Sequence, residues 1–324
     1  MEIRHVALLL ICLLKLKNIF SITQIFDGEG LASVPSSIYP NVTELSCQAN
    51  SITVIQQSDF NNKYPDLFSI DLDDNHISSI EVGCFTGTVL KKIWLAKNDL
   101  SAIPDFREVG ETLENIDLGI NRIAILEVGD LNYLTRLLSL NLRYNLITSV
   151  ADGSFEGTKL RYVALQNNQI TKFPDLRAVN STMQILDLEF NNIGQISRQE
   201  IDHLGILETM KLKGNPISLL PDLTEYLPLL KILVLTATPL QCCCSMAWLK
   251  QITNGLSLDS LPCKSPSKWN QLTWNEIAGD MIEKEPCEID ASHWISCQRR
   301  RRSWSFHSGF INPSLDHAVI TFDY

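Results

Sequence analysis

The stretch LLSLNLRYNLI, Leu137–Ile147, decides the fold of this chain. Leucine or isoleucine occupies its first, fourth, sixth and eleventh positions and Asn145 occupies the ninth, which gives the template L-x-x-L-x-L-x-x-N-x-[IL]. The template recurs along most of the chain, with 23 to 25 residues between successive asparagines. These asparagines are Asn50, Asn75, Asn98, Asn121, Asn145, Asn168, Asn191 and Asn215, and a weaker last copy has Thr238 instead.

This template is the leucine-rich repeat signature. One copy cannot bury its own leucines, so copies stack and each contributes a short strand to a shared core. The buried asparagine supplies two donors and an acceptor for backbone groups at the bend. We therefore predict an α/β leucine-rich repeat solenoid: a curved horseshoe with about nine repeats at residues 42–240 and a parallel sheet on its concave face.

Two kinds of segment connect the predicted strands on the convex side. Residues 78–87 and 148–157 share a Phe followed by Gly, and that Phe should pack inward. The segments beginning at Ile103, Phe173 and Leu220 instead contain a Pro-Asp turn. Proline fixes φ and removes a hydrogen-bond donor, so these connections predict little helix.

Composition limits the functional classes. The 324 residues are 45% hydrophobic and carry a formal net charge of −10, which argues against a nucleic-acid partner. Nine cysteines in a repeat protein favour an oxidising compartment.

Residues 1–23 resemble a secretory signal peptide. Arg4 and His5 precede the apolar run Val6–Leu14, which is too short to span a bilayer. Cleavage is expected near Ser21–Thr23, and the alternatives are an uncleaved anchor or a buried helix. With cleavage, the mature chain has no membrane span and is secreted.

Residues 24–41 form a lead-in whose V-P-x-x-I sequence resembles the end of the N-terminal cap of extracellular leucine-rich repeat proteins. That cap usually contains cysteines, but none lies between Cys12 and Cys47. We therefore expect either weaker protection at this end of the stack or an incomplete start of the gene model.

Residues 241–290 closely resemble the cysteine-rich C-terminal cap of extracellular leucine-rich repeat proteins of the Toll-like, Slit and Nogo-receptor kinds. The residues that carry this resemblance are Pro239, Leu240, Cys242, Cys244, Trp248, Leu249, Cys263, Pro266 and Cys287. The resemblance implies the disulfides Cys242–Cys263 and Cys244–Cys287. A zinc site is disfavoured, because no second C-x-x-C occurs and secreted thiols usually oxidise.

The other cysteines leave alternatives open. Cys243 departs from the cap pattern and either bridges to Cys297 or one of the two stays free or bridges to another chain. Cys47 occupies an inward leucine position, which predicts a buried thiol, with a Cys47–Cys84 bridge as the alternative.

The tail, residues 291–324, contains the tetra-arginine Arg299–Arg302. Its R-x-R-R sequence resembles a site for furin-like convertases that cleave after Arg302. Contact with sulfated glycans and a solvated patch without function are the alternatives.

Function is expected on the concave face, because strand side chains alternate between the core and the outer surface. The outward positions and the strand exits carry acidic, aromatic and basic residues that form the predicted ligand-binding surface: Asp71, Asp73, Trp94, Asp117, Asn141, Arg143, Tyr144, Asp187, Glu189, Phe190 and Lys211. Nine strands provide a face of about 600 Å², which suits a protein or a long glycan better than a metabolite.

Two N-x-[ST] sequons, at Asn41 and Asn180, lie just before predicted strands and are expected to carry glycans. The six histidines are scattered, and no nucleophile, metal-binding or phosphate-binding motif occurs. The sequence therefore predicts no enzyme, no metal and no cofactor.

We predict a secreted module that binds a protein or long glycan through its concave face. The resemblance implies adhesion, guidance or innate immune recognition. The alternatives are a matrix component of the proteoglycan kind and a receptor ectodomain truncated by the gene model.

Overall fold

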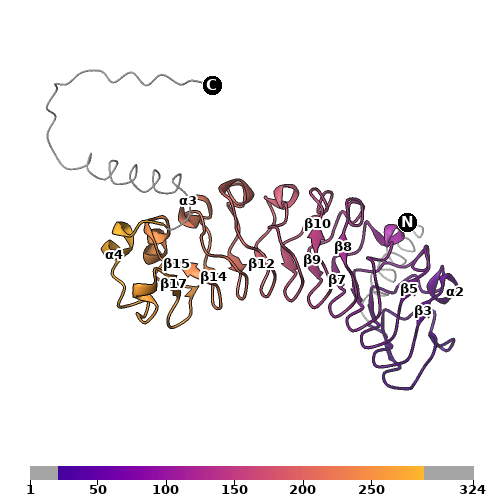
Figure 1. Ribbon diagram of the computed structural model, residues 1–324. Helices are drawn as coiled ribbons and strands as arrows, with labels where there is room; N and C mark the ends of the chain where they lie inside the picture. Colours follow the sequence, from indigo (N-terminus) through magenta and orange to yellow (C-terminus); the bar gives the residue numbers. More distant parts are fainter. Residues whose placement is uncertain (1–20, 288–324) are drawn as a thin grey trace, which may run out of the picture.

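The computed structural model describes residues 21–287. These residues form a curved stack of repeats that follow one another in chain order from the N-terminal to the C-terminal end (Figure 1). The predicted solenoid is confirmed. The signal segment before residue 21 and the tetra-arginine tail lie outside the described residues.

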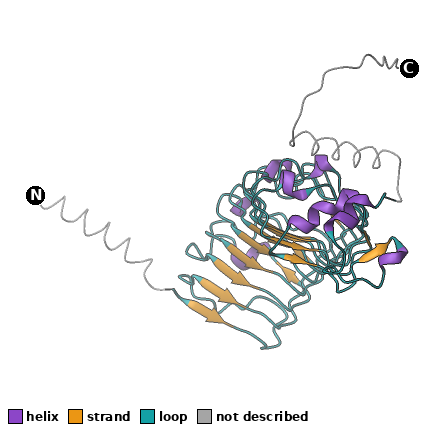
Figure 2. Ribbon diagram, turned by 90° about the vertical axis from the view of Figure 1, so that its left-hand side faces the viewer, coloured by secondary structure: helices purple, strands orange, loops and turns teal. Residues whose placement is uncertain are grey.

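One parallel sheet of eleven strands lines one face of the described stack (Figure 2). In spatial and chain order the strands are β1 (Thr23–Ile25), β2 (Glu44–Ser46), β4 (Ser69–Asp71), β6 (Lys92–Trp94), β7 (Asn115–Asp117), β9 (Ser139–Asn141), β11 (Tyr162–Ala164), β12 (Ile185–Asp187), β13 (Thr209–Lys211), β14 (Ile232–Val234) and β16 (Leu256–Ser257).

The sheet has two strands more than the nine repeats predict. At the N-terminal end, β1 pairs with β2, and the amides of Thr43 and Glu44 donate to the Ile22 carbonyl. At the other end, β16 pairs with β14. Neither added strand belongs to a copy of the template, so both escape a search for evenly spaced leucines.

The convex side consists of short elements and turns. The described residues contain three two-stranded ribbons: β3 (Val54–Ile55) with β5 (Ser79–Ile80), β8 (Ile125–Leu126) with β10 (Ser149–Val150), and β15 (Leu240–Gln241) with β17 (Cys263–Ser265). The described α-helices are α2 (Gln57–Phe60), α3 (Leu223–Tyr226) and α4 (Gly279–Lys284). The 3-10 helices are η1 (Arg107–Val109), η2 (Arg177–Val179), η3 (Arg198–Glu200), η4 (Cys244–Gln251) and η5 (Ser267–Trp269). The expectation of little helix is confirmed.

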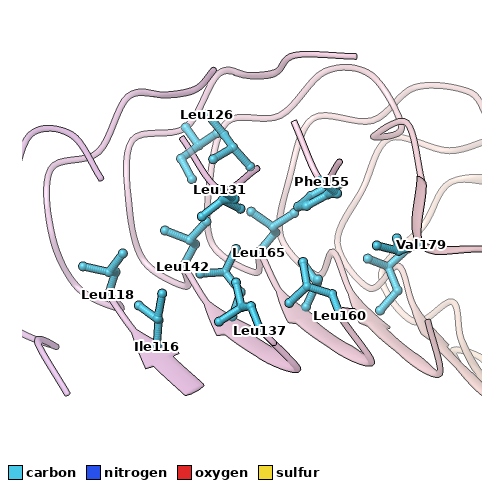
Figure 3. Packing of buried hydrophobic residues seen from close by; sticks show 14 of the residues in the cluster. Ile116, Leu118, Leu126, Leu131, Leu137, Leu142, Phe155, Leu160, Leu165 and Val179 are labelled. Atoms are coloured by element: carbon cyan, nitrogen blue, oxygen red, sulfur yellow. The ribbon is translucent and has the colours of Figure 1, made fainter. Parts of the chain in front are cut away.

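The core fills the space between the sheet and the convex segments. Leucines of successive repeats stack there, as Leu118, Leu142 and Leu165 do in Figure 3, and all three are fully buried. Phe85 and Phe155 of the Phe-Gly connections are also fully buried, as predicted. Each layer thus buries its apolar surface only against its neighbours, so the stack must be closed at its ends.

The repeat asparagines join the layers by hydrogen bonds. Asn145 illustrates the pattern: its Nδ2 donates to the carbonyls of Leu118 (2.9 Å) and Leu142 (3.0 Å). Its Oδ1 accepts from the Ile123 amide at 2.9 Å. The other repeat asparagines follow the same scheme, which confirms the predicted role of the series.

The C-terminal cap differs from the predicted disulfide pattern. Cys242 pairs with Cys263, as predicted, but Cys243 pairs with Cys287, so the predictions Cys244–Cys287 and Cys243–Cys297 are both wrong. The Cys244 amide donates to the Glu285 carbonyl at 2.9 Å, and this contact brings Cys287 beside Cys243 with a Cα–Cα distance of 5.1 Å. Cys244 also takes part in a disulfide.

The two remaining described cysteines, Cys47 and Cys84, are free and buried, so they are not bridged to each other. Burial raises the pKa of the Cys47 thiol to about 12, and it raises the pKa of Cys84 further. Both thiols are therefore protonated core residues, as predicted for Cys47.

Candidate functional site

The strand register assembles the predicted ligand-binding residues into columns on the concave face. Asp71, Trp94 and Asp117 pair in register on neighbouring strands, and Asn141 follows Asp117. Farther along, Asp187 pairs with Lys211. The structure therefore places these residues in one continuous row.

The first half of the face is acidic. Asp71 and Asp73 lie on the same repeat, and Asp27, just after β1, adds a carboxylate that the sequence reasoning missed. Burial raises the pKa of Asp73 to about 7; the Ala96 amide donates to this carboxylate and opposes the shift, while Asp71 and Asp117 add to it. The pKa of Asp71 is also raised, first by burial and then by Asp27 and Asp117.

The centre of the face is a polar network around Arg143. The Asn141 Nδ2 donates to Asp117 at 2.8 Å. The Arg143 side chain lies across Gly119, where an added Cβ would come within 3.0 Å of its Cγ. The Arg143 Nε is buried without a hydrogen-bond partner among the described residues.

The second half of the face contains an ion pair. Lys211 Nζ lies 3.0 Å from an oxygen of Asp187, whose side chain is 6% exposed. Hydrogen bonding to Asp187 raises the pKa of Lys211. The pKa of Tyr162 on β11 is also raised, first by burial and then by the negative charge of Asp187. The nearby Glu189 also has a raised pKa, caused mainly by burial.

Sequence reasoning missed one outward column, at the first residue of each strand. It contains Tyr162, Ile185 (36% exposed) and Ile232 (44% exposed). The predicted surface contains only outward residues between and after the paired leucines of the template, although alternation along the strand also places the first residue of each strand outward. Extending the alternation by one position would have revealed these residues.

Tyr144 and Phe190 do not lie on the strands. Each occupies the third position after its strand ends, with the backbone in the left-handed region at φ 53° and 52°. They are 54% and 43% exposed, so they form a separate edge next to the face.

The two sequons lie at the opposite edge. Asn41 precedes β2, Asn180 precedes β12, and both are exposed. The Thr182 hydroxyl of the second sequon donates to the Leu160 carbonyl at 2.8 Å. Glycosylation at either site remains a prediction.

Within residues 21–287, no three His, Cys, Asp or Glu side chains are arranged to hold a metal ion. Over the same range, no helix combines the length and apolar character that a bilayer crossing requires.

This chain is similar to known leucine-rich repeat proteins. Residues 111–172 match the family model described as "Leucine rich repeat", and residues 17–122 match a "BspA type Leucine rich repeat region (6 copies)". Asporin of Bos taurus is 28% identical over 168 residues, 51% of this chain and 45% of asporin. Tsukushi of Xenopus tropicalis is 27% identical over 215 residues, 64% of this chain and 59% of Tsukushi.

The matches thus span about half of the relatives' own length. A solved leucine-rich repeat protein of Leptospira interrogans superposes with a TM-score of 0.54 at 21% identity, covering 72% of this chain and 64% of that one, which supports the fold alone. The repeats, the disulfide-bonded cap and these matches identify the chain as a leucine-rich repeat protein of the kind that forms extracellular ectodomains.

Proposed function

We propose that this protein is a secreted recognition module that binds a protein ligand through the concave face of its sheet. The size of that face carries the proposal. The eleven strands are separated by ten intervals of about 4.8 Å, which makes the face about 48 Å long. Five extended residues per repeat at about 3.3 Å each make it about 16 Å wide, so its area is about 770 Å². A standard protein interface buries about 800 Å² on each partner, so one protein ligand suits the whole face.

The chemistry of the face supports the same proposal. Trp94 lies between Asp71 and Asp117 in register, and Arg143 lies two residues beyond Asn141, which pairs with Asp117. Aromatic and Arg side chains carry most of the binding free energy in protein interfaces. The ion pairs and amides around them would fix the orientation of the ligand.

The cap supports the proposed location outside the cell. Disulfides Cys242–Cys263 and Cys243–Cys287 persist in oxidising compartments and are rare where thiols are kept reduced. The predicted signal segment and the sequons at Asn41 and Asn180 agree with secretion.

The test is an ectodomain interaction screen with the purified full chain, repeated with Trp94→Ala/Arg143→Ala. The control is Tyr39→Ala/Arg136→Ala, which removes one aromatic and one arginine from exposed positions off the sheet. A ligand found in the screen should lose at least about tenfold in affinity for the first variant and none for the control. Equal binding by both variants would show that the ligand binds elsewhere than on the concave face.

A second candidate function is attachment to sulfated glycans through Arg299–Arg302, which the charge of this run favours. Retention on a heparin column should then disappear when all four arginines are replaced by serine. Retention that persists would exclude this segment as the glycan contact.

A further inference from the structure

Four consecutive repeats place one residue each at the point where the chain leaves the sheet. These residues, Ile120, Tyr144, Asn167 and Phe190, are called the exit ridge. The amide of each donates to a carbonyl of the next repeat, so they stand on adjacent rungs. At about 4.8 Å per rung the exit ridge is roughly 14 Å long. Ile120, Tyr144 and Phe190 are 39%, 54% and 43% exposed, so the exit ridge presents apolar surface to solvent.

The backbone of the exit ridge disfavours these side chains. Ile120, Tyr144 and Phe190 have φ of 56°, 53° and 52°, in the left-handed region that suits glycine and, to a lesser degree, asparagine. Every repeat has a left-handed residue at this position, and elsewhere in the chain it is a small or polar residue: Ala49, Asp74, Lys97, Asn167, Gly214 or Ala237. A β-branched isoleucine is among the least suited residues there. Local backbone preference therefore does not explain the three bulky residues.

The packing around Phe190 adds a second observation. A Cβ on Gly214 would lie 2.6 Å from Phe190 Cδ1, so the ring lies across a position that only glycine leaves open. Lys213 Nζ lies 5.2 Å from the ring centre, a cation–π distance. The neighbouring repeat thus accommodates Phe190 on the surface rather than burying it.

Neither the stability of the fold nor its solubility accounts for strained, exposed apolar residues on three of four consecutive rungs. Such features cluster where a partner binds. Leu146, two residues beyond Tyr144, is 48% exposed and enlarges the apolar area. Asn41 and Asn180 lie at the opposite ends of the parallel strands, so glycans there would leave the exit ridge clear.

The charge next to the exit ridge indicates what kind of partner fits. Asp27, Asp71, Asp73 and Asp117 lie on the repeats that lead up to Tyr144. Within the described residues they accept hydrogen bonds from uncharged groups, for example from Ser46 to Asp27 at 2.6 Å. These carboxylates repel a sulfated glycan and attract lysine or arginine side chains.

We propose that the exit ridge is the apolar contact of a protein ligand whose aromatic or aliphatic side chains are flanked by lysine or arginine on the side facing the first half of the sheet. The proposal rests on the proposed function and deepens it, because it names the contact and the orientation of the ligand. A second copy of this chain and a sulfated glycan are the competing occupants.

The probe is a phage-displayed library of random peptides of about twelve residues, long enough to span roughly 40 Å when extended. It is panned on the immobilised full chain with counter-selection on the empty support only, and the recovered peptides are then compared on the triple variant Ile120→Asn/Tyr144→Asn/Phe190→Asn. Recovered peptides should combine aromatic or aliphatic residues with Lys or Arg. Recovery of acidic peptides, or of peptides without apolar residues, would overturn the proposal.

Affinities of the synthesised peptides then separate the outcomes. The triple variant should lose at least about tenfold in affinity, and Asp71→Asn/Asp73→Asn should lose about three- to tenfold at low salt and less at high salt. The control Val82→Asn/Val128→Asn removes exposed apolar side chains from the convex connections and should change nothing. Loss with Trp94→Ala but not with the triple variant would overturn the exit ridge and keep concave-face recognition, whereas loss with neither would overturn both.

Stability and assembly give two further readouts. Asparagine suits the left-handed backbone, so the triple variant should melt at the same temperature as the wild type or up to about 3 °C higher. A clear fall in melting temperature would show that the three residues serve the fold instead. If light scattering shows that the wild type is a dimer and the triple variant a monomer, the occupant is a second copy of this chain. If the wild type binds heparin and the triple variant does not, the occupant is a glycan. Either result would overturn the proposed partner.

Discussion

Replacing Asn191 by alanine tests the hydrogen-bonded ladder that joins the repeats. Asn191 is 4% exposed, and its Nδ2 donates to the carbonyls of Leu165, Leu188 and Glu189 at 2.9, 3.1 and 3.3 Å. Its Oδ1 accepts from the Ile170 amide at 3.0 Å. One side chain thus holds four backbone groups of two adjacent repeats.

The magnitude follows from which of these groups lose their only partner. The three carbonyls each keep another donor, from a neighbouring repeat asparagine or from the main chain, so their loss is partial and costs about 1–2 kcal/mol together. The Ile170 amide has no such substitute and becomes a buried orphan, which costs about 1–3 kcal/mol. Asn191→Ala should therefore lower the free energy of unfolding by about 2–5 kcal/mol.

The next residue provides a matched control. Asn192 is exposed, so Asn192→Ala removes the same chemical group and should change the free energy of unfolding by less than about 0.5 kcal/mol. Urea unfolding followed by far-UV circular dichroism, with the disulfides intact, measures both. Hydrogen exchange at Ile170 should rise only in Asn191→Ala. Equal unfolding midpoints for the two variants would refute the assignment of the ladder.

Three further predictions concern titration and cysteine chemistry. The pKa of Asp73 is about 7 in the folded state and about 4 in the unfolded state, so ionisation of this group lowers the stability of the fold as the pH rises between these values. The melting temperature of Asp73→Asn relative to the wild type should therefore increase from pH 4 to pH 8, and a decrease over this range would contradict the raised pKa. Cys47 and Cys84 should resist iodoacetamide in the native protein and react after denaturation, and rapid native labelling would contradict their burial. Non-reducing peptide mapping should find Cys243 linked to Cys287, and a peptide linking Cys287 to a different cysteine would contradict the pairing.

The sequence predicts the inward half of this molecule well. Each leucine of the template has one environment, the core between sheet and convex segments, and each asparagine has one partner set at the bend. A period near 24 residues therefore fixes strand, register and core together. The outward positions of Asp71, Trp94 and Asp117 are predicted by the same pattern, because the register of the leucines also sets the register of the residues between them.

The ends of the stack were harder to predict, for physical reasons. Strands β1 and β16 pair with repeats but contain no full template, because an end layer has only one neighbour to bury. In the cap, three adjacent cysteines make several pairings compatible with the sequence. The choice of Cys243 over Cys244 depends on where the Glu285 main chain lies, which is a long-range contact.

The exit ridge shows a different kind of limit. Inward positions are constrained by packing, and most concave positions are neutral to the fold, so Trp94 can be there without harming stability. Ile120 is different, because its left-handed backbone opposes it. A residue whose backbone conformation is unfavourable for its side chain is stronger evidence of function than a residue whose identity does not affect stability. Hydrophobic periodicity cannot detect this conflict, because the conflict becomes visible only when the backbone φ is known. Trp94 on the concave face is therefore a weaker indicator of the binding surface than Ile120. The sequence alone ranks these two residues in the opposite order.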